Sequence, residues 1–359
     1  MSKKVMAAMS GGVDSSVAAA ILKEQGFDVC GATLKLFSND DIDDTDKPTR
    51  TCCSLSDVED ARQVARKMGF EHFVFNFGDE FKKCVMSKFI NSYIKGLTPN
   101  PCIDCNRYIK FSKLLERARV LGNDYIATGH YAQIEFDEKS GRYLMKKAVD
   151  LSKDQTYVLY AMTQDELAHT LFPLGALLKS EVREMAQQRG LINARKPDSQ
   201  DICFVPDGDY AGFIERSLGR KAQKGKFTDC RGNVLGEHEG VIRYTIGQRK
   251  GLGITFGEPR YVVAKNAADN TVTLGKHEEL FSDKLTACDA NWIMIESLTE
   301  PMKVQAKTRY KQNAVGAVIS PLEGGRVLCC FDEPQRAVTS GQAVVFYSGD
   351  YVVGGATIE

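Results

Sequence analysis

The chain has 359 residues, 43% of them hydrophobic and 26% charged, a composition typical of globular proteins and not of disordered ones. Lys plus Arg and Asp plus Glu each number 47, and this balance argues against a protein that coats nucleic acid non-specifically. No apolar run is long enough to span a bilayer, and the start, MSKKVMAAMSGG, resembles neither a secretory signal nor an amphipathic presequence. We therefore expect a cytoplasmic protein of two or three domains.

The first half of the sequence alternates short apolar segments with amphipathic ones. The pattern predicts strands over 4–9, 28–37, 72–77 and 124–131, and helices after residue 12, over 57–70 and over 110–121. Helical spacing then continues to about residue 192. This order predicts an open parallel α/β sheet, whose ligand crevice lies at the carboxyl ends of the strands. The segments SGGVDS and TGH both follow such ends.

The character of the sequence changes twice after this half. Beyond Pro206 it is Gly-rich and basic, and from about residue 284 it consists of short alternating segments separated by turn signals. The last pattern predicts a small β-barrel or sandwich. We therefore expect a catalytic domain over 1–206, a small central domain over 207–280 and a β-barrel over 281–359.

The segment SGGVDSS (10–16) joins the first predicted strand to the first helix. Its two glycines permit a tight turn that presents N–H groups to an anion at the helix N-terminus, and its serines add hydroxyl donors. Asp14 would hold Mg²⁺ against bound phosphates. The pattern G-x-x-x-x-G-K-[ST] is absent, which excludes a P-loop kinase or GTPase. A Gly-Ser turn without a ligand is the alternative interpretation.

The 11 cysteines are unusual for a chain without an export signal. A disulfide framework is not expected, so each cysteine is a core residue, a metal ligand or a reactive thiol. Cys102 and Cys105 form a C-x-x-C whose spacing fits half a zinc site, a redox pair, cluster ligands or a catalytic thiol with an incidental neighbour. By itself, Cys203 fits a core cysteine. A zinc site that added Cys52 and Cys53 would lack a second clean pair.

Eight segments taken together resemble the bacterial tRNA-specific 2-thiouridylases, a family of ATP pyrophosphatases. In the family's order and across essentially the whole chain, they are SGGVDSS, PNPCIDCNRYIKF, ATGHYA, LSKDQTYVLY, LFPLG, KPDSQDICF, RYTIGQRKGLG and VVFY. The resemblance implies an open parallel sheet of the adenine-nucleotide α-hydrolase type, a small central domain and a C-terminal β-barrel. It also implies an activity, in which ATP adenylates O2 of the wobble uridine at position 34 of tRNA and sulfur then replaces that oxygen.

The resemblance assigns roles to individual residues of this chain. Cys203 would carry a persulfide received from an upstream sulfur carrier protein or cysteine desulfurase, and Cys105 would attack it. ATP with Mg²⁺ would bind Ala8, Met9, Ser10, Gly11, Gly12, Val13, Asp14, Ser15, Leu34 and Gly129. The tRNA would contact Asn100, Pro101, Cys102, His130, Lys153, Asp154, Gln155, Arg309, Tyr310 and Gln342.

The chain departs from the family pattern at one position that bears on the mechanism. The family commonly has P-N-P-D-x-x-C-N, with the Asp proposed as acid and base, where this chain has Cys102. Asp104 is close by but does not occupy the matching position. The thiols of Cys102, Cys105 and Cys203 would together leave one iron of a [4Fe–4S] cluster open to bind sulfide. A persulfide relay and a cluster-bound sulfide therefore remain as alternatives.

Two other classes of function fit parts of the sequence. An ammonia-using ATP pyrophosphatase would share the phosphate loop, but no glutaminase portion is evident and the thiol motifs would have no role. A non-catalytic RNA-binding or zinc protein would leave SGGVDSS without a purpose. Local basic clusters favour an enzyme that binds RNA phosphates, and they comprise Arg216, Arg220, Lys221, Lys224, Lys226, Arg243, Arg249 and Lys250.

Overall fold

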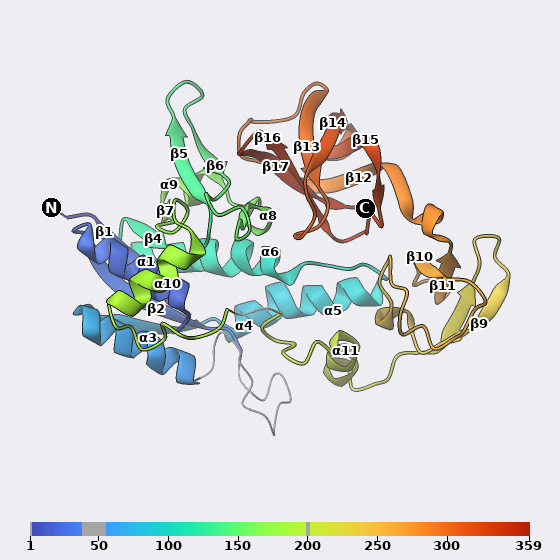
Figure 1. Ribbon diagram of the computed structural model, residues 1–359, viewed down its shortest axis with the longest axis horizontal. Coiled ribbons are helices and arrows are strands. Elements are labelled where there is room, and N and C mark those ends of the chain that lie inside the picture. The colour runs from blue at the N-terminus through green and yellow to red at the C-terminus, as the bar shows by residue number, and fades with distance from the viewer. Residues whose placement is uncertain (1, 38–54, 199–201) are drawn as a thin grey trace.

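The computed structural model describes residues 2–37, 55–198 and 202–359. These residues form a parallel sheet at the N-terminal end of the chain, a small mixed sheet and a C-terminal barrel, each with helices or loops around it (Figure 1). The pair Cys52 and Cys53, considered above for a zinc site, lies outside the described residues. Within the described ranges no helix is long and apolar enough to cross a membrane.

The N-terminal sheet has five parallel strands in the order β3-β2-β1-β4-β7. The strands are β1 (Lys4–Ala8), β2 (Asp28–Lys35), β3 (His72–Asn76), β4 (Tyr125–Ala127) and β7 (Thr170–Leu171). The helices α1 (Val13–Glu24), α3 (Leu55–Met68) and α10 (Lys179–Gln188) accompany it, and α1 packs against both others. The predicted open parallel α/β sheet is confirmed.

The sheet differs from the sequence-based prediction in three places. The strand predicted over 124–131 ends at Ala127, because the chain leaves the sheet there and turns toward the phosphate loop. The last strand, β7, lies in a segment predicted as helical, directly after the short helix α9 (Gln164–Ala168). The hairpin of β5 (Gln133–Asp137) and β6 (Arg142–Lys146) was not predicted. It joins the barrel sheet through a pairing of β6 with β17.

Two long helical segments run beneath the barrel in Figure 1, and each contains a π-helical stretch. The second begins at Pro101, well before the predicted start at Lys110, because a proline suits the first helical turn and Asn100 caps it. π-Helical turns occur mostly at functional sites. In chain order the parts are α4 (Gly78–Phe81), η1 (Lys82–Met86), α5 (Ser87–Ile94), α6 (Pro101–Cys105), η2 (Asn106–Lys113) and α7 (Leu114–Val120). The short helix α8 (Thr156–Leu159) packs against α6 and η2.

The Gly-rich middle of the sequence folds into a four-stranded sheet in the order β10-β11-β8-β9. Helix α11 (Tyr210–Leu218) precedes this sheet, and the 3₁₀ turn η3 (Val241–Arg243) follows its second strand. The strands are β8 (Gly225–Thr228), β9 (Val234–His238), β10 (Tyr261–Asn266) and β11 (Thr271–Gly275).

The C-terminal strands form a closed barrel, because the first strand, β12, also pairs with the last, β17. This closure confirms the predicted β-barrel, which the alternating pattern by itself could not distinguish from a sandwich. The strands are β12 (Phe281–Trp292), β13 (Met302–Lys307), β14 (Val315–Leu322), β15 (Arg326–Arg336), β16 (Ala343–Ser348) and β17 (Tyr351–Ile358). The 3₁₀ turns η4 (His277–Leu280) and η5 (Glu323–Gly325) precede β12 and β15.

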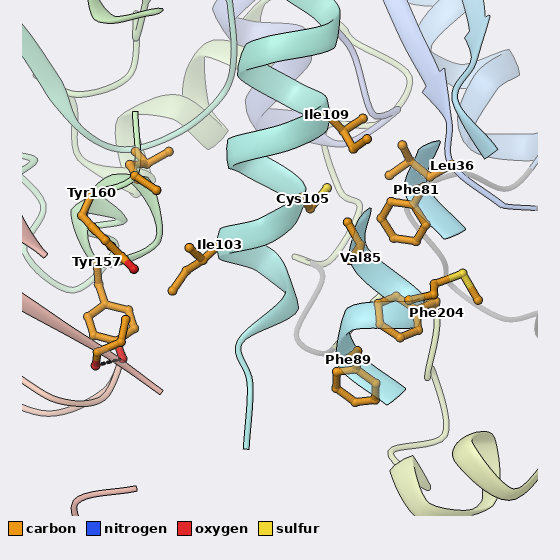
Figure 2. Packing of buried hydrophobic residues seen from close by; sticks show 14 of the residues in the cluster. Leu36, Phe81, Val85, Phe89, Ile103, Cys105, Ile109, Tyr157, Tyr160 and Phe204 are labelled. Carbon is orange, nitrogen blue, oxygen red and sulfur yellow. Dashed lines mark hydrogen bonds between the residues drawn. The ribbon is translucent and has the colours of Figure 1, made fainter. Parts of the chain in front are cut away.

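A cluster of aromatic side chains joins the α4–η1–α5 segment to the chain that follows Cys203 (Figure 2). Phe204 is 1% exposed, and its ring centroid lies 5.3 Å from that of Phe89 and 5.7 Å from that of Phe81. Phe213 of α11 packs on the other side of Phe204, with a centroid distance of 5.3 Å. This packing fixes where the chain around Cys203 crosses the two long helical segments.

We predict that Phe89→Ala lowers the free energy of unfolding by about 3–5 kcal/mol, because it opens a cavity among these rings. Phe136→Ala is the matched control, since Phe136 on the β5–β6 hairpin is 52% exposed, and its loss is expected to cost less than about 1 kcal/mol. Chemical denaturation of both variants measures the difference. Equal losses would contradict the central place of Phe89 in the core.

Candidate functional site

The turn between β1 and α1 requires a glycine at its first position. Gly11 has φ +72°, and a Cβ atom there would lie 2.3 Å from the carbonyl oxygen of Asp57, which is far inside a van der Waals contact. The hydroxyl of Ser15 accepts a hydrogen bond from the backbone N–H of Ser10 at 3.2 Å. The first N–H groups of α1 have no acceptor within the helix, so the turn presents them to a ligand at its carboxyl edge.

The segment after β4 forms a second wall against the same turn. A Cβ atom on Gly129 would lie 2.7 Å from the backbone carbon of Asp14 and 2.7 Å from the nitrogen of Ser15. Leu34 occupies the carboxyl end of the neighbouring strand β2. The structure thus brings the residues expected to bind ATP, which come from three separate segments, to one edge of the sheet.

Asp14, the residue expected to hold Mg²⁺, is held by a lysine in this structure. Its two carboxylate oxygens lie 2.6 and 2.7 Å from Nζ of Lys179, and Tyr131 donates its hydroxyl to one of them at 3.0 Å. Lys179 is buried, and its ammonium also lies 2.9 Å from the carboxylate of Asp198. Among the described residues no group of three or more His, Cys, Asp or Glu side chains is placed to hold a metal ion.

The carboxylate of Asp198 balances several cations near the loop. Burial opposes its ionisation, but hydrogen bonds from Lys179 and Lys153 prevail and lower the pKa of Asp198 to about 2. Arg183 adds a contact of 2.8 Å. Sequence analysis did not single out Lys179 or Arg183, because both lie in an amphipathic helix whose spacing carries no motif.

The carbonyl groups of the phosphate loop are bonded by side chains from the segment after α10. The amide Nδ2 of Asn193 donates to the carbonyl oxygens of Gly11 and Gly12 at 3.0 and 3.1 Å, and to the hydroxyl of Ser16 at 2.8 Å. Lys196 Nζ binds Asp57 at 2.5 Å and also reaches the carbonyl of Gly11 at 3.3 Å. Asn193 and Lys196 therefore support the loop, and only the three-dimensional fold reveals them.

Cys105 is the last residue of α6, and it is 7% exposed. Cys102, in the same helix, is exposed. Figure 2 shows the Cys105 side chain directed to the side of the helix on which Val85 and Phe204 lie. Phe204 follows Cys203 directly, and Cys203 packs against the same core cluster as Cys105. Phe204, next to Cys203, therefore lies on the side of the helix toward which Cys105 points (Figure 2). Within the described chain the structure does not gather Cys105 and Cys203 with Cys102 into a ligand set.

Asp104, the carboxylate nearest to the missing family Asp, is part of an ion-pair network. Its oxygen lies 2.6 Å from Nζ of Lys88, and its side chain is 9% exposed. Burial raises the pKa of Asp104, against the lowering effect of Lys88. One turn on, Arg107 donates to Asp289 of β12 at 3.2 Å. These pairs connect the α6–η2 helix to α5 and to the barrel.

The loop before α6 is bonded to both other sheets. The N–H of Thr98 donates to the carbonyl of Ser340 at 2.9 Å, and Gln342 donates its side-chain amide to the carbonyl of Thr98 at 2.7 Å. From the central sheet, Lys265 Nζ reaches the Thr98 hydroxyl at 3.5 Å. The next polar residue, Asn100, accepts the N–H of Cys102 at 3.1 Å. The helix N-terminus is thus fixed relative to the barrel and the central sheet.

An aromatic and cationic group lies beside this helix N-terminus. The ring of Tyr310 lies 6.1 Å from that of Tyr157, and the ammonium of Lys307 lies 5.6 Å from the Tyr310 centroid. Burial first, and then the charges of Asp154 and Cys102, raise the pKa of Tyr310. Such a group suits the stacking of an unpaired base. Lys307 and Tyr157 were not expected from the sequence.

The other residues expected to contact tRNA already have partners within the chain. Lys153 pairs with Asp198 at 2.9 Å, and Gln155 accepts the N–H of Tyr131 at 2.9 Å. The ring of His130 packs between Phe111 and Phe172, its Nδ1 lies 2.7 Å from the hydroxyl of Thr128, and burial lowers its pKa well below the ordinary value. The imidazole is therefore neutral at physiological pH.

Comparisons with known proteins cover the whole chain. A family model described as the tRNA methyl transferase HUP domain matches residues 3–207, the PRC-barrel domain model of the same family matches 211–276, and an aminomethyltransferase beta-barrel domain model matches 282–358. The tRNA-specific 2-thiouridylase MnmA of Acetivibrio thermocellus is 55% identical, with 99% of each chain covered. The chain belongs to the tRNA-specific 2-thiouridylase family. The family member of Clostridioides difficile is 53% identical over 100% of this chain and 99% of that one.

Among solved structures, a 4-thiouridine synthetase–RNA complex with bound ATP aligns with 57% of this chain and 45% of that chain, at 18% identity and a TM-score of 0.35.

We predict that Gly129→Ala weakens ATP binding by at least about ten-fold, because its methyl group would push the first turn of α1 out of place. Gly257→Ala is the matched control, since nothing lies within 4 Å of a Cβ atom at Gly257. Calorimetric titration with ATP measures both variants. Unchanged ATP affinity in Gly129→Ala would contradict the assignment of the segment after β4 to the ATP site.

We also predict a pH effect from Lys265, whose burial lowers its pKa from 10.5 to about 8. Between these two values the unfolded chain binds more protons than the folded one, so this side chain makes the unfolding free energy rise with pH. In Lys265→Met that contribution is absent. Denaturation at pH 7.5 and pH 9.5 should show the stability of the wild-type protein rising relative to the variant. A difference that does not change with pH would contradict the prediction.

Proposed function

We propose that this chain uses ATP to replace O2 of the wobble uridine, position 34 of tRNA, by sulfur. One observation carries the proposal: a loop built for an anion, and a helix that directs Cys105 to the side on which the neighbour of Cys203 lies (Figure 2), occur together in a member of the tRNA-specific 2-thiouridylase family. We expect the reaction in the cytoplasm, where ATP and tRNA are both present.

The first proposed step makes O2 a leaving group. The carbonyl at C2 of uridine is a poor electrophile, so O2 attacks the α-phosphorus of ATP, and pyrophosphate leaves at the loop of residues 10–15. The N–H groups of this loop and the ammonium of Lys179 stabilise the charge of the departing pyrophosphate. A bound triphosphate would give Lys179 a new anionic partner, and the carboxylate of Asp14 would then be the residue to hold Mg²⁺, which would supply further positive charge at the phosphates. The proposed ligands of the nucleotide are residues 8–15, Leu34 and Gly129.

The second proposed step transfers sulfur between two cysteines and the base. An upstream sulfur donor leaves a persulfide on Cys203, and the thiolate of Cys105 attacks the Sγ atom of Cys203, which breaks the bond from Sγ to the outer sulfur. A disulfide between the two residues forms and hydrosulfide is released, since sulfur is strongly nucleophilic at neutral pH. The hydrosulfide attacks C2, and AMP leaves with the former O2. A dithiol reductant then restores both thiols.

The alternative, sulfide held on a [4Fe–4S] cluster, would need Cys102 as a third ligand. The relay is favoured because Cys102 is exposed and the described residues do not gather the three thiols into one set. We propose instead that Cys102, with Asn100 and Pro101, lines the pocket of the target base.

The proposed binding site for the target uridine lies at the N-terminus of α6. A uridine drawn out of the anticodon loop would stack near Tyr310, where Lys307 supplies a positive charge for the backbone. His130, Lys153, Asp154, Gln155, Arg309 and Gln342 complete the set of proposed contacts. Gln155 and Gln342 already form hydrogen bonds within the protein, so these two side chains would also hold the shape of the pocket.

We predict that Cys203→Ser and Cys105→Ser each reduce 2-thiouridine formation at least about 100-fold while tRNA affinity is retained. Cys230→Ser is the control, because Cys230 is an exposed cysteine of the central domain. The readout is mass spectrometry of nucleosides from digested tRNA. Wild-type activity in Cys203→Ser would overturn the proposed sulfur transfer.

The variant Cys102→Ala separates the two sulfur mechanisms. The relay predicts that anaerobically purified wild-type protein is colourless and thiolates tRNA without iron, and that Cys102→Ala retains most of the activity. Stoichiometric iron and sulfide in the wild-type protein, lost together with activity in Cys102→Ala, would contradict the relay and support the cluster.

A further inference from the structure

A second pocket, of about 410 Å³, lies at the end of the barrel that meets the central domain. It is formed by the turn after β13, by the start of strand β12 and by the end of strand β15. The lining residues used below are Phe281, Arg309, Lys311, Gln312, Gln335 and Arg336. None of the residues that line it is acidic.

The positive charge in this pocket has no counter-ion among the described residues. Arg309 and Arg336 lie on either side of Gly247, since a Cβ atom there would be 3.9 Å from a terminal nitrogen of Arg309 and 3.7 Å from one of Arg336. Burial, and then the charge of Arg336, lower the pKa of Arg309. By contrast Arg326, at the other end of β15, pairs with Glu359 at 3.6 Å.

Neutral groups hold the half-buried guanidinium of Arg309 in place. Its Nη2 donates to the carbonyl oxygen of Ala337 at 2.6 Å, to the hydroxyl of Thr339 at 3.1 Å and to the carbonyl of Ile246 at 3.4 Å. These contacts position Arg309 without cancelling its charge. An anion that enters the pocket would therefore meet donors already in place, which is the condition for strong charge-assisted hydrogen bonds.

The pocket also offers an aromatic face and amide groups. Phe281 is 42% exposed, with its ring centroid 5.2 Å from that of His277. Gln312 and Gln335 are bonded to each other at 2.7 Å within the lining. Cations for a phosphate, an exposed ring for a base and amides for its edge are together the chemistry of a nucleotide site in RNA-binding proteins.

This pocket is separate from the proposed uridine site. Tyr310 turns toward Tyr157 and Lys307, whereas the preceding Arg309 turns toward Ile246 of the central domain. Gly247 belongs to the segment RYTIGQRKGLG, whose exposed Arg249 and Lys250 extend the positive charge. The pocket thus joins the basic loop of the central domain to the barrel.

We propose that this pocket binds one nucleotide of the bound tRNA outside the uridine that is modified, with its phosphate on Lys311 and Arg336 and its base on Phe281. The proposal rests on the proposed function, because it takes tRNA as the substrate. Binding here adds affinity for the whole tRNA and takes no part in the reaction at C2.

The double variant Lys311→Ala/Arg336→Ala tests the proposal. It is expected to weaken binding of full-length tRNA by about ten-fold or more at moderate salt. The slope of log affinity against log salt concentration should become shallower by about one, because one phosphate loses its cationic partners. In the thiolation assay, KM for tRNA should rise, while kcat at saturating tRNA stays within about two-fold. Lys303→Ala, an exposed lysine of β13, is the matched control and should change neither slope nor KM.

Two results would overturn the proposal. The first is a double variant whose tRNA affinity and salt slope equal those of Lys303→Ala. The second is a double variant whose kcat falls while KM is unchanged, because the pocket would then act on the reaction. Phe281→Ala adds a check on stacking, and it should weaken tRNA binding by about ten-fold without a change in salt slope. The binding measurements need no turnover, so a wild-type protein that binds tRNA but does not thiolate it would contradict the proposed function alone.

Discussion

The barrel and the central sheet both bond the few residues that precede the Cys105 helix, and this junction determines the geometry of the proposed uridine site. Thr98 is bonded by Ser340 and Gln342 of the barrel and by Lys265 of the central sheet. The Arg107–Asp289 pair adds a second link between helix and barrel. The position of a base bound at Asn100–Cys102 would therefore depend on the position of every domain. Contacts far from the reaction could control the reaction in this way.

The charges around the phosphate loop connect the nucleotide site to the sulfur site. Lys179 lies between Asp14 on the loop and Asp198 on the chain that leads to Cys203, and it is buried whereas the two carboxylates are partly exposed. A triphosphate changes the charge on one side of this lysine, so nucleotide binding and the position of Asp198 are expected to be coupled. The neutral donors of Asn193 hold the loop itself and are independent of that change.

The sequence predicts local features well and long-range ones poorly, for physical reasons. The parallel sheet follows from periodicity, and Gly11 follows from a motif because only glycine fits beside Asp57. Strand β7 has two residues and no period, so it could not be distinguished from the preceding helix. The roles of Lys179, Asn193 and Arg336 depend on partners more than a hundred residues away or in another domain, and no pattern in the sequence marks them. The alternating pattern alone predicted a barrel or a sandwich, and the family resemblance decided for the barrel, since closure depends on pairing between its first and last strands.

Adenylation of the uridine oxygen is the claim on which the mechanism depends, and an oxygen label tests it directly. A tRNA with ¹⁸O at O2 of the wobble uridine is incubated with the protein, ATP and a persulfide donor, and the AMP produced is analysed by mass spectrometry. The account predicts one ¹⁸O atom in AMP for each 2-thiouridine formed, because O2 becomes an oxygen of the AMP phosphate. AMP without the label, at the same yield of 2-thiouridine, would contradict it.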